Sequence, residues 1–263
     1  MRKLSNELQR RFAPTQKNSS RNSAQQSRTR TRKEQANLAT GLLFDFDGTL
    51  YGDWRLWISI IEGTLSDFKI TITPHDALEM ARRMIENGGN AKSTIRISSI
   101  AAALAKDRGI NLPEEEVRTR FFERLDARMD QTGPDEKLVK LLKEFTNRGC
   151  RMGIVTFVRK PRILRRLDVW KLKEYFPSVI TPDDVLEFKP SPRPFLKAME
   201  ELHVQPDECF VVGDEPVDMM GGREAGAKTI GLPQGFFTGQ ELEKAGADRI
   251  LSSLELLPTM VYK

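Results

Sequence analysis

The sequence predicts an α/β fold in which a parallel β-sheet, covered by helices, is interrupted once by a long helical insertion. Two observations carry this prediction. From residue 134 onward, short apolar runs alternate with amphipathic segments, which is typical of a parallel sheet with helices on both faces. Between residues 54 and 129, almost every segment instead has helical periodicity. We therefore expect a core that the chain leaves and later re-enters.

The first predicted element is a strand over residues 42–46, because the apolar run Leu42-Leu43-Phe44 is short and ends at charged residues. The insertion then opens with an amphipathic helix whose apolar positions recur at spacings of three and four. These positions are Trp54, Trp57, Ile58, Ile61, Leu65 and Phe68. Further helices are predicted at residues 74–86, 92–108 and 114–129. The insertion is thus predicted to be entirely helical.

The chain after the insertion is predicted to alternate helices and strands. The predicted elements are helix 135–147, strand 151–156, helix 160–168, strand 178–180, helix 193–203, strand 209–213, helix 216–225, strand 227–231, and a strand and helix from residue 249. This order predicts a Rossmann-like, doubly wound parallel sheet. The α/β core then comprises residues 41–52 and 134–263, and residues 53–133 form the helical subdomain.

The composition indicates a soluble protein. Hydrophobic residues make up 39% of the 263 residues, enough for a core. No stretch approaches the roughly 18 apolar residues of a membrane helix, so we expect no membrane association. Cys150 and Cys209 lie far apart and lack metal-binding spacing, which indicates reduced thiols in a reducing compartment. We expect a cytoplasmic monomer or homodimer.

The positive charge of the chain is concentrated in residues 1–40. This segment has ten Lys or Arg and two Glu, whereas the remaining residues have 32 basic and 35 acidic side chains. It is rich in Ser, Gln, Asn and Thr, so it is predicted to be a disordered basic tail. Three interpretations stay open: a solvated extension, a mitochondrial or plastid transit peptide, and a segment that contacts nucleic acid or another polyanion.

Two acids one residue apart, Asp45 and Asp47, follow the first predicted strand and precede Gly48-Thr49-Leu50. Open parallel sheets bind ligands at the carboxyl ends of their strands. If the extended geometry persists, residues two apart share a face, and both carboxylates point at one centre. The alternative for a bare Asp-x-Asp is an acidic strand end that only feeds a turn.

Three further strand ends or loops carry polar residues. Thr156 ends a predicted strand before a helix, where a hydroxyl can bind a phosphate oxygen or simply cap the helix. Lys189 lies in a proline-rich loop before another helix, and by itself it could be an ordinary surface lysine. Gly213-Asp214 closes an apolar strand, and Asp218 would lie on the first turn of the next helix, facing back toward the strand end.

Together these residues resemble the four motifs of the haloacid dehalogenase-like hydrolases. The order Asp45-x-Asp47-Gly-Thr-Leu, Thr156, Lys189 and Gly213-Asp214-x-x-x-Asp218 matches that family, over residues 41–263. The helical insertion resembles the helical cap of the phosphoglycolate phosphatase and β-phosphoglucomutase branch. One departure is Phe157, because phosphatases of this branch often have Asn or Ser there, so a side-chain contact to the phosphate is not expected at this position.

The resemblance implies specific roles. Asp45 would attack phosphorus and form an aspartyl-phosphate, and Asp47 would protonate the leaving oxygen and later activate water. Thr156 and Lys189 would hold the transferring oxygens. In the family, the metal ligands are the Asp45 carboxylate, the Asp47 main-chain carbonyl and the Asp214 carboxylate, with Asp218 in support.

Four carboxylates beside a phosphate require a cation. Lys189 supplies a single positive charge, and like charges would otherwise raise carboxyl pKa values and repel the substrate. The candidate ligands are oxygens, and neither His75 nor His203 neighbours a motif, which favours Mg²⁺.

We therefore predict a Mg²⁺-dependent phosphatase that hydrolyses a small-molecule phosphate monoester, of phosphoglycolate or sugar-phosphate type. One alternative is a phosphomutase of the same family, in which the aspartyl-phosphate is passed to a sugar instead of water. Another is a non-catalytic protein that docks to nucleic acid through its basic tail.

Overall fold

The computed structural model describes residues 40–86 and 93–262, which belong to one compact unit, Ala39–Lys263. For residues 81–86 and 93–98 the description is limited to the backbone. The predicted disordered tail, residues 1–40, lies outside the described residues except for Thr40, so its disorder stays a prediction.

A six-stranded sheet in the order β3-β2-β1-β4-β5-β6 forms the centre of this unit, and every neighbouring pair is parallel. The chain runs outward from β1 to β3 and then crosses to the other side of β1 for β4 to β6. This order confirms the predicted doubly wound α/β fold and places the topological switch point between β1 and β4. The strands are β1 (Gly41–Phe44), β2 (Arg151–Val155), β3 (Ser178–Ile180), β4 (Cys209–Gly213), β5 (Lys228–Gly231) and β6 (Arg249–Ile250).

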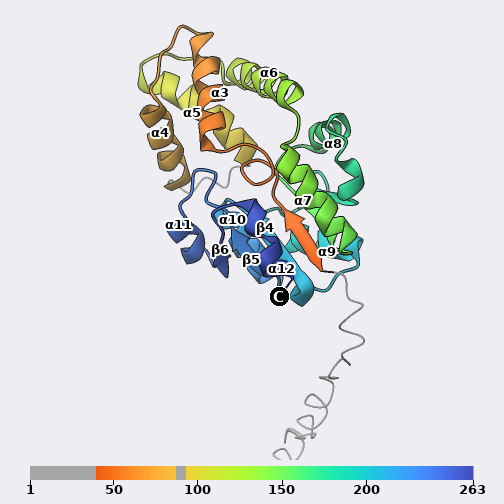
Figure 1. Cartoon of the computed structure of the whole chain (residues 1–263). Coiled ribbons are helices and arrows are strands. Elements are labelled where there is room, and N and C mark those ends of the chain that lie inside the picture. The colour runs from red at the N-terminus through yellow and green to blue at the C-terminus, as the bar shows by residue number, and fades with distance from the viewer. Residues whose placement is uncertain (1–39, 87–92, 263) are drawn as a thin grey trace, which may run out of the picture. The chain divides into compact units, whose positions relative to one another are not determined.

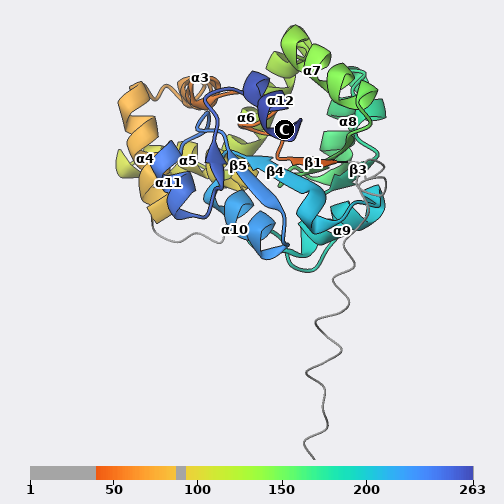
Figure 2. The same cartoon turned by 60° about the horizontal axis from the view of Figure 1, so that its bottom comes forward.

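Helices cover both faces of the sheet, as Figure 2 shows. Successive strand residues point to opposite faces, so Leu42 and Phe44 join one apolar cluster and Leu43 joins another. The first cluster includes side chains of α7, α8 and α12, and the second includes those of α9. The helices of the core are α7 (Glu136–Asn147), α8 (Lys160–Val169), α9 (Arg193–Leu202), α10 (Pro216–Glu224), α11 (Gly239–Lys244) and α12 (Pro258–Val261).

The segment between β1 and α7 is helical, as predicted, and its helices pack side by side (Figure 1). Asp53 caps the first of them, because its carboxylate accepts from the backbone N–H groups of Arg55 and Leu56. The predicted apolar stripe is buried at Trp57, Ile61 and Leu65. These helices are α3 (Trp54–Ser66), α4 (Pro74–Glu86), α5 (Ser93–Asp107) and α6 (Glu114–Thr132). We call α3 to α6 the cap.

Helix α11 was not predicted. It is only six residues long, too short for a periodic apolar pattern to stand out. Its sequence signal is a capping box, in which Thr238 and Glu241 each bond to the other's backbone N–H. Single 3₁₀ turns complete the described elements at η1 (Lys173–Tyr175), η2 (Pro206–Glu208) and η3 (Leu254–Leu256).

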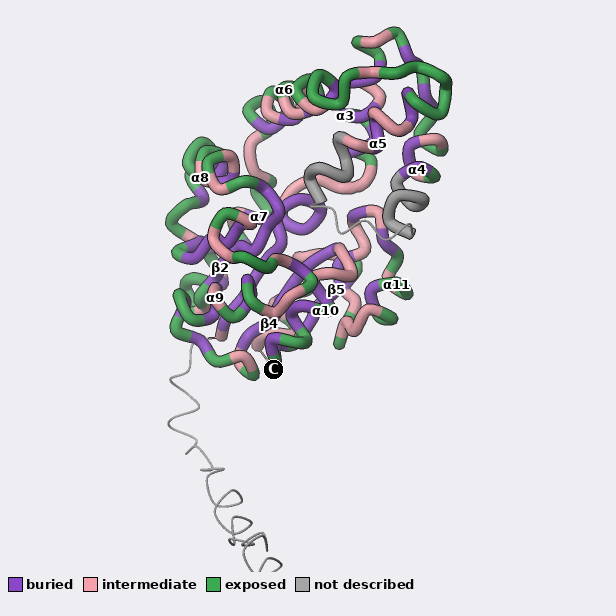
Figure 3. Tube along the Cα trace, turned by 180° about the vertical axis from the view of Figure 1, so that it is seen from behind, coloured by how far each residue is buried: buried purple, intermediate pink, exposed green. Residues whose placement is uncertain are grey.

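Burial follows these layers, as the tube in Figure 3 shows. All residues of β1, β3 and β4 are buried. Both cysteines are free thiols, and burial raises the pKa of Cys209 to about 12, so this thiol is unreactive at neutral pH. None of the helices within residues 40–86 and 93–262 is both long and apolar enough to span a lipid bilayer.

The first strand is shorter than predicted. It ends at Phe44, and the chain then turns, with the backbone N–H groups of Leu50 and Tyr51 both donating to the Phe46 carbonyl. Gly48 has a φ of 91°, a conformation that glycine adopts without strain. The expectation that Asp45 and Asp47 share one face depended on a strand that continues to Asp47, and this condition is not met, because β1 ends at Phe44.

The turn predicts an unequal response to two glycine substitutions. An ideal Cβ on Gly48 would lie 2.3 Å from Asp214 Oδ2, whereas one on Gly149, whose φ is 78°, would meet no atom within 4 Å. Gly149→Ala should therefore cost only the conformational penalty, about 1–2 kcal/mol. Gly48→Ala should cost about 1–3 kcal/mol more in the free energy of unfolding, because of the clash. Urea denaturation measures both, and equal losses would contradict this geometry.

Candidate active site

The predicted site residues gather at the carboxyl edge of the sheet, beside the switch point. Asp45 directly follows β1, Thr156 follows β2 and Asp214 follows β4, while Lys189 comes from the loop before α9. All are buried, with Lys189 only 6% exposed. Parallel strands end at the same edge, which is why motifs far apart in the sequence meet here.

Lys189 is the centre of this group. Its Nζ lies 2.7 Å from Asp45 Oδ1 and 2.6 Å from Asp218 Oδ1. Burial alone would favour the neutral amine, but the carboxylates of Asp218 and Asp45 outweigh it and raise the pKa of Lys189. Lys189 is therefore a buried, protonated cation and not an ordinary surface lysine.

Asp218 lies on the first turn of α10 and faces back toward β4, as the sequence indicated. Its Oδ2 accepts from the Glu215 backbone N–H at 3.2 Å. The carboxylate lies directly over Gly213, since an ideal Cβ there would be 2.4 Å from its carboxyl carbon. Gly213 thus leaves the space through which Asp218 reaches Lys189.

Asp214 is enclosed by the turn after β1. Its Oδ1 accepts from the Thr49 hydroxyl at 3.0 Å, and an ideal Cβ on Gly48 or Gly235 would lie within 2.3 Å of Oδ2. Burial raises the pKa of Asp214, and repulsion by Asp45 adds to the increase, while the Thr49 hydrogen bond opposes it. Sequence reasoning did not assign a role to Thr49, although it stands within the first motif.

Asp47 has a different partner from Asp45. Its Oδ1 lies 3.2 Å from Nη1 of Arg166, a side chain that is only 2% exposed. Burial raises the pKa of Asp47, and Arg166 opposes the increase. Burial also lowers the pKa of Arg166. Arg166 is a site residue that sequence reasoning missed, because an arginine at the amphipathic face of α8 carries no motif.

Thr156 and Phe157 form the second strand end. The Thr156 hydroxyl oxygen accepts from the Val158 backbone N–H at 3.2 Å, a local capping contact. The Phe157 ring packs edge-on against Phe188 with centroids 4.9 Å apart, and Lys189 Nζ lies 5.5 Å from the Phe157 centroid. Phe157 thus provides an apolar wall beside Lys189 in place of a polar contact.

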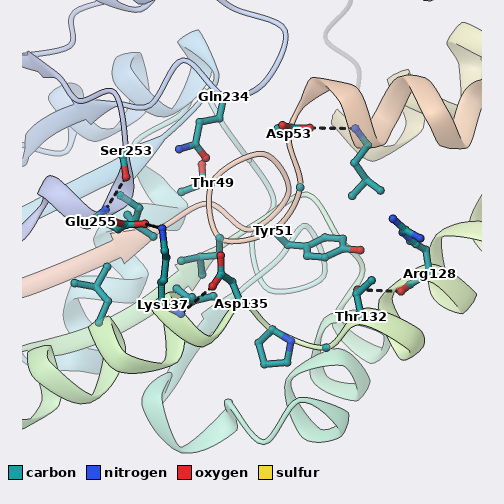
Figure 4. A pocket seen from close by; sticks show the side chains of 18 residues that line it. Thr49, Tyr51, Asp53, Arg128, Thr132, Asp135, Lys137, Gln234, Ser253 and Glu255 are labelled. Carbon is teal, nitrogen blue, oxygen red and sulfur yellow. Dashed lines mark hydrogen bonds and ion pairs between the residues drawn. The ribbon is translucent and has the colours of Figure 1, made fainter.

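Two cavities border the region. One, of about 550 Å³, is lined by Phe157 and Val158 and by side chains of α6 and α8, including Phe122 and Arg162. The other, of about 500 Å³, is drawn in Figure 4 and is lined by both connections between core and cap, at residues 51–53 and 132–135. Asp45, Lys189 and Asp214 line neither cavity; the first includes Phe157, and the second includes Thr49, whose hydroxyl donates to Asp214.

The acidic group suits a hard divalent cation in ligand type and charge. Asp45 and Asp214 offer carboxylate oxygens, which Mg²⁺ prefers. Burial raises the pKa of both, and a divalent cation would relieve the repulsion between them. Within the described ranges, no three His, Cys, Asp or Glu side chains converge as metal ligands. The expected set draws on two carboxylates and the Asp47 main-chain carbonyl, so it does not require such a triad.

Comparison with known proteins defines the family. The family model for haloacid dehalogenase-like hydrolases matches residues 42–232. A proposed pyrophosphatase, PpaX, from Clostridium perfringens (strain 13 / Type A) is 30% identical over 205 residues, which cover 78% of this chain and 87% of that protein. The chain therefore belongs to the haloacid dehalogenase-like hydrolase family, and the predictions of this family and of a hydrolase are confirmed.

Solved structures share the fold at lower identity. A predicted phosphoglycolate phosphatase from Haemophilus somnus 129PT has a TM-score of 0.67 and 19% identity, covering 84% of this chain and 97% of that one. The proposed HAD-hydrolase YfnB from Bacillus subtilis, solved bound to magnesium, has a TM-score of 0.67 and 18% identity, with coverages of 86% and 100%. At these identities the likeness supports the fold alone.

The raised pKa of Asp214 predicts a pH-dependent stability change. A carboxyl group whose folded-state pKa exceeds its unfolded value, about 3.9, contributes stability below that value and loses it as the pH rises through the folded-state pKa. At pH 7 in EDTA, Asp214→Asn removes a destabilising charge and keeps an oxygen for Thr49. The Tm should rise by about 2–4 °C, and the gain should disappear near pH 3.

Thermal melts across this pH range test the expectation, with Asp207→Asn, at an exposed aspartate, as the control that should change little. A lower Tm for Asp214→Asn at pH 7 would show that the charge stabilises the fold.

Proposed function

We propose that this chain is a Mg²⁺-dependent phosphatase that hydrolyses a small-molecule phosphate monoester through an aspartyl-phosphate on Asp45. The observation that carries the proposal is the buried ion pair between Lys189 and Asp45, 2.7 Å apart at the switch point of the sheet. A nucleophile held beside a fixed cation suits attack on an anionic phosphate. Membership of the hydrolase family supports the same chemistry.

In the first step, an Asp45 carboxylate oxygen attacks phosphorus, and the bond from phosphorus to the ester oxygen breaks. Asp47 donates a proton to that leaving oxygen. Lys189 and the Thr156 end of β2 hold the phosphoryl oxygens, so that charge is stabilised where it accumulates. Asp218, through its ion pair, keeps Lys189 protonated and in place.

In the second step, water attacks the phosphorus of the aspartyl-phosphate. Asp47, now ionised, accepts a proton from this water, and the bond between phosphorus and the Asp45 oxygen breaks. Inorganic phosphate leaves and the Asp45 carboxylate is restored. Splitting the displacement in two allows one carboxyl group to serve as acid and then as base.

Asp45, Asp214 and the main-chain carbonyl of Asp47 would hold Mg²⁺, and Asp218 would support them from α10. Bound there, the cation would neutralise negative charge on the phosphoryl group as it transfers. This choice of cation agrees with the magnesium bound in the Bacillus subtilis structure, whose likeness to this chain is one of fold. The acidic group in this chain supports it independently, by ligand type and charge.

The substrate is proposed to be of phosphoglycolate or sugar-phosphate type. The cavity of about 550 Å³ beside Phe157 offers room for a leaving group of that size. A second candidate is inorganic pyrophosphate, which is favoured by the 30% identical relative named for that activity. We further propose that the protein acts in the cytoplasm as a monomer or homodimer.

A substrate panel tests the proposal. Wild type with Mg²⁺ should release phosphate from one or more of phosphoglycolate, sugar phosphates and pyrophosphate, and EDTA should abolish this. Asp45→Asn removes the nucleophile, so kcat should fall by about 10³-fold or more. Asp207→Asn, an exposed carboxylate changed in the same way, should retain wild-type activity. Equal, slow release by wild type and Asp45→Asn would contradict the proposal.

Product analysis in the same assay separates hydrolysis from the mutase alternative. A phosphatase releases free phosphate from a sugar phosphate, whereas a mutase returns an isomeric sugar phosphate. Acid quenching should trap phosphate on wild type but not on Asp45→Asn.

Removal of residues 1–39 tests the basic tail. The truncation keeps Thr40, whose carbonyl accepts from the Arg151 backbone N–H and extends the pairing of β1 with β2. Phosphatase kcat/KM should stay within about twofold of wild type, because every proposed catalytic residue is retained. Salt-sensitive binding to a polyanion such as heparin should be lost if the tail carries it. A loss of activity on truncation would show that the tail takes part in catalysis.

A further inference from the structure

A series of charged side chains connects the buried pair of Asp47 and Arg166 with the partly exposed Asp126 and Arg162 at the cap. Arg166 on α8 contacts Asp47 through Nη1 at 3.2 Å, and its Nη2 lies 3.8 Å from Oδ1 of Asp126 on cap helix α6. Asp126 in turn accepts a hydrogen bond from Arg162, which also donates to the Phe122 carbonyl at 3.0 Å. Contacts between charged side chains thus connect the proposed acid/base, Asp47, with α8 and then with α6.

The hydrogen bonding within this series of charged side chains is incomplete. In the described part of the protein, Asp47 Oδ2, Arg166 Nε and Nη2, and Asp126 Oδ1 are buried and accept or donate no hydrogen bond. Desolvated charges are costly unless their hydrogen bonds are well satisfied. Apolar residues in place of both Asp47 and Arg166 would pack the same space without this cost, so stability alone does not require the pair.

Because these hydrogen bonds are incomplete, Arg166 has polar groups left for closer contact with either Asp47 or Asp126. A small movement of α6 relative to α8 would change the 3.8 Å separation between Arg166 and Asp126, and with it how Arg166 is shared between its two carboxylates. Coulomb attraction in a buried setting is steep at these distances. A change in this sharing would also change the attraction between Arg166 and the Asp47 carboxylate.

We propose that Arg166 is the positioning residue for Asp47 and that Asp126 links this pair to the position of the cap. The inference rests on the proposed phosphatase function, in which Asp47 delivers a proton to the leaving oxygen. In this role Arg166 fixes where the Asp47 carboxylate points and acts through that carboxylate, not by binding the substrate itself.

Two substrates distinguish this role from a merely structural one. An alkyl phosphate needs a proton on its leaving oxygen, whereas 4-nitrophenyl phosphate leaves as a stabilised anion and needs little help. Loss of a well-placed acid therefore slows the alkyl ester selectively, while general damage to the fold slows both alike. The informative quantity is the ratio of kcat/KM for the two esters.

The experiment compares Arg166→Met with Arg165→Met, on the full chain with Mg²⁺, using 4-nitrophenyl phosphate and the best alkyl monoester of the panel. Arg165 is the matched control, because it also pairs α8 with α6, through Asp130 at 2.9 Å, but it is exposed and does not contact Asp47. Arg166→Met should lower kcat/KM for the alkyl ester about 100-fold and for the aryl ester less than 10-fold. Arg165→Met should leave the ratio unchanged.

Two milder variants guard against misfolding. Arg166→Lys keeps the charge and should restore part of the ratio, and Asp126→Asn should change it in the same direction as Arg166→Met but less. Equal losses for the two esters in Arg166→Met and Arg166→Lys would overturn the role of Arg166. A wild-type ratio in Asp126→Asn would overturn the link to the cap. Failure of wild type to hydrolyse either ester would instead overturn the proposed function.

Discussion

The structure depends on holding four carboxylates out of water at one edge of a parallel sheet. Asp45, Asp47, Asp214 and Asp218 are all buried, which is costly unless positive charge compensates them. Two cations do so. Lys189 pairs with Asp45 and Asp218, and Arg166 pairs with Asp47. The remaining imbalance, strongest around Asp214, matches the charge of a divalent cation.

This division of cations separates the two proposed chemical roles. Lys189 belongs to the group that would bind and attack phosphorus, whereas Arg166 belongs to the group that would move the proton. The first group is built from rigid strand ends and the first turn of α10. The second extends through α8 to the cap helix α6, so it is sensitive to the cap. A reaction that needs one fixed nucleophile and one adjustable acid is served by this arrangement.

Sequence patterns were sufficient for the element order and for the residues that follow the strands. Apolar runs that stop at Asp45, Thr156 and Asp214 indicated strand ends at one edge of a parallel sheet, and the resemblance to the family indicated their roles. Sequence patterns were insufficient at the end of β1 and at the short helix α11. The strand ends at Phe44, not Phe46, because the backbone N–H groups of Leu50 and Tyr51 close a turn on the Phe46 carbonyl, and α11 was too short to show a period.

The sequence by itself determined the doubly wound α/β class, because the periodicity of apolar residues is a local property of the chain. The order of its motifs, which resembles that of the hydrolase family, indicated the family and the cluster of Asp45, Lys189, Asp214 and Asp218. Only the tertiary structure decided the partner of Asp47. Arg166 lies 119 residues away and belongs to no motif, so its place beside Ile163 and Leu167 on the buried face of α8 does not indicate that Asp47 is its partner. Its neighbour Arg165 is exposed. Which of two adjacent arginines becomes buried is set by how α8 packs on the sheet.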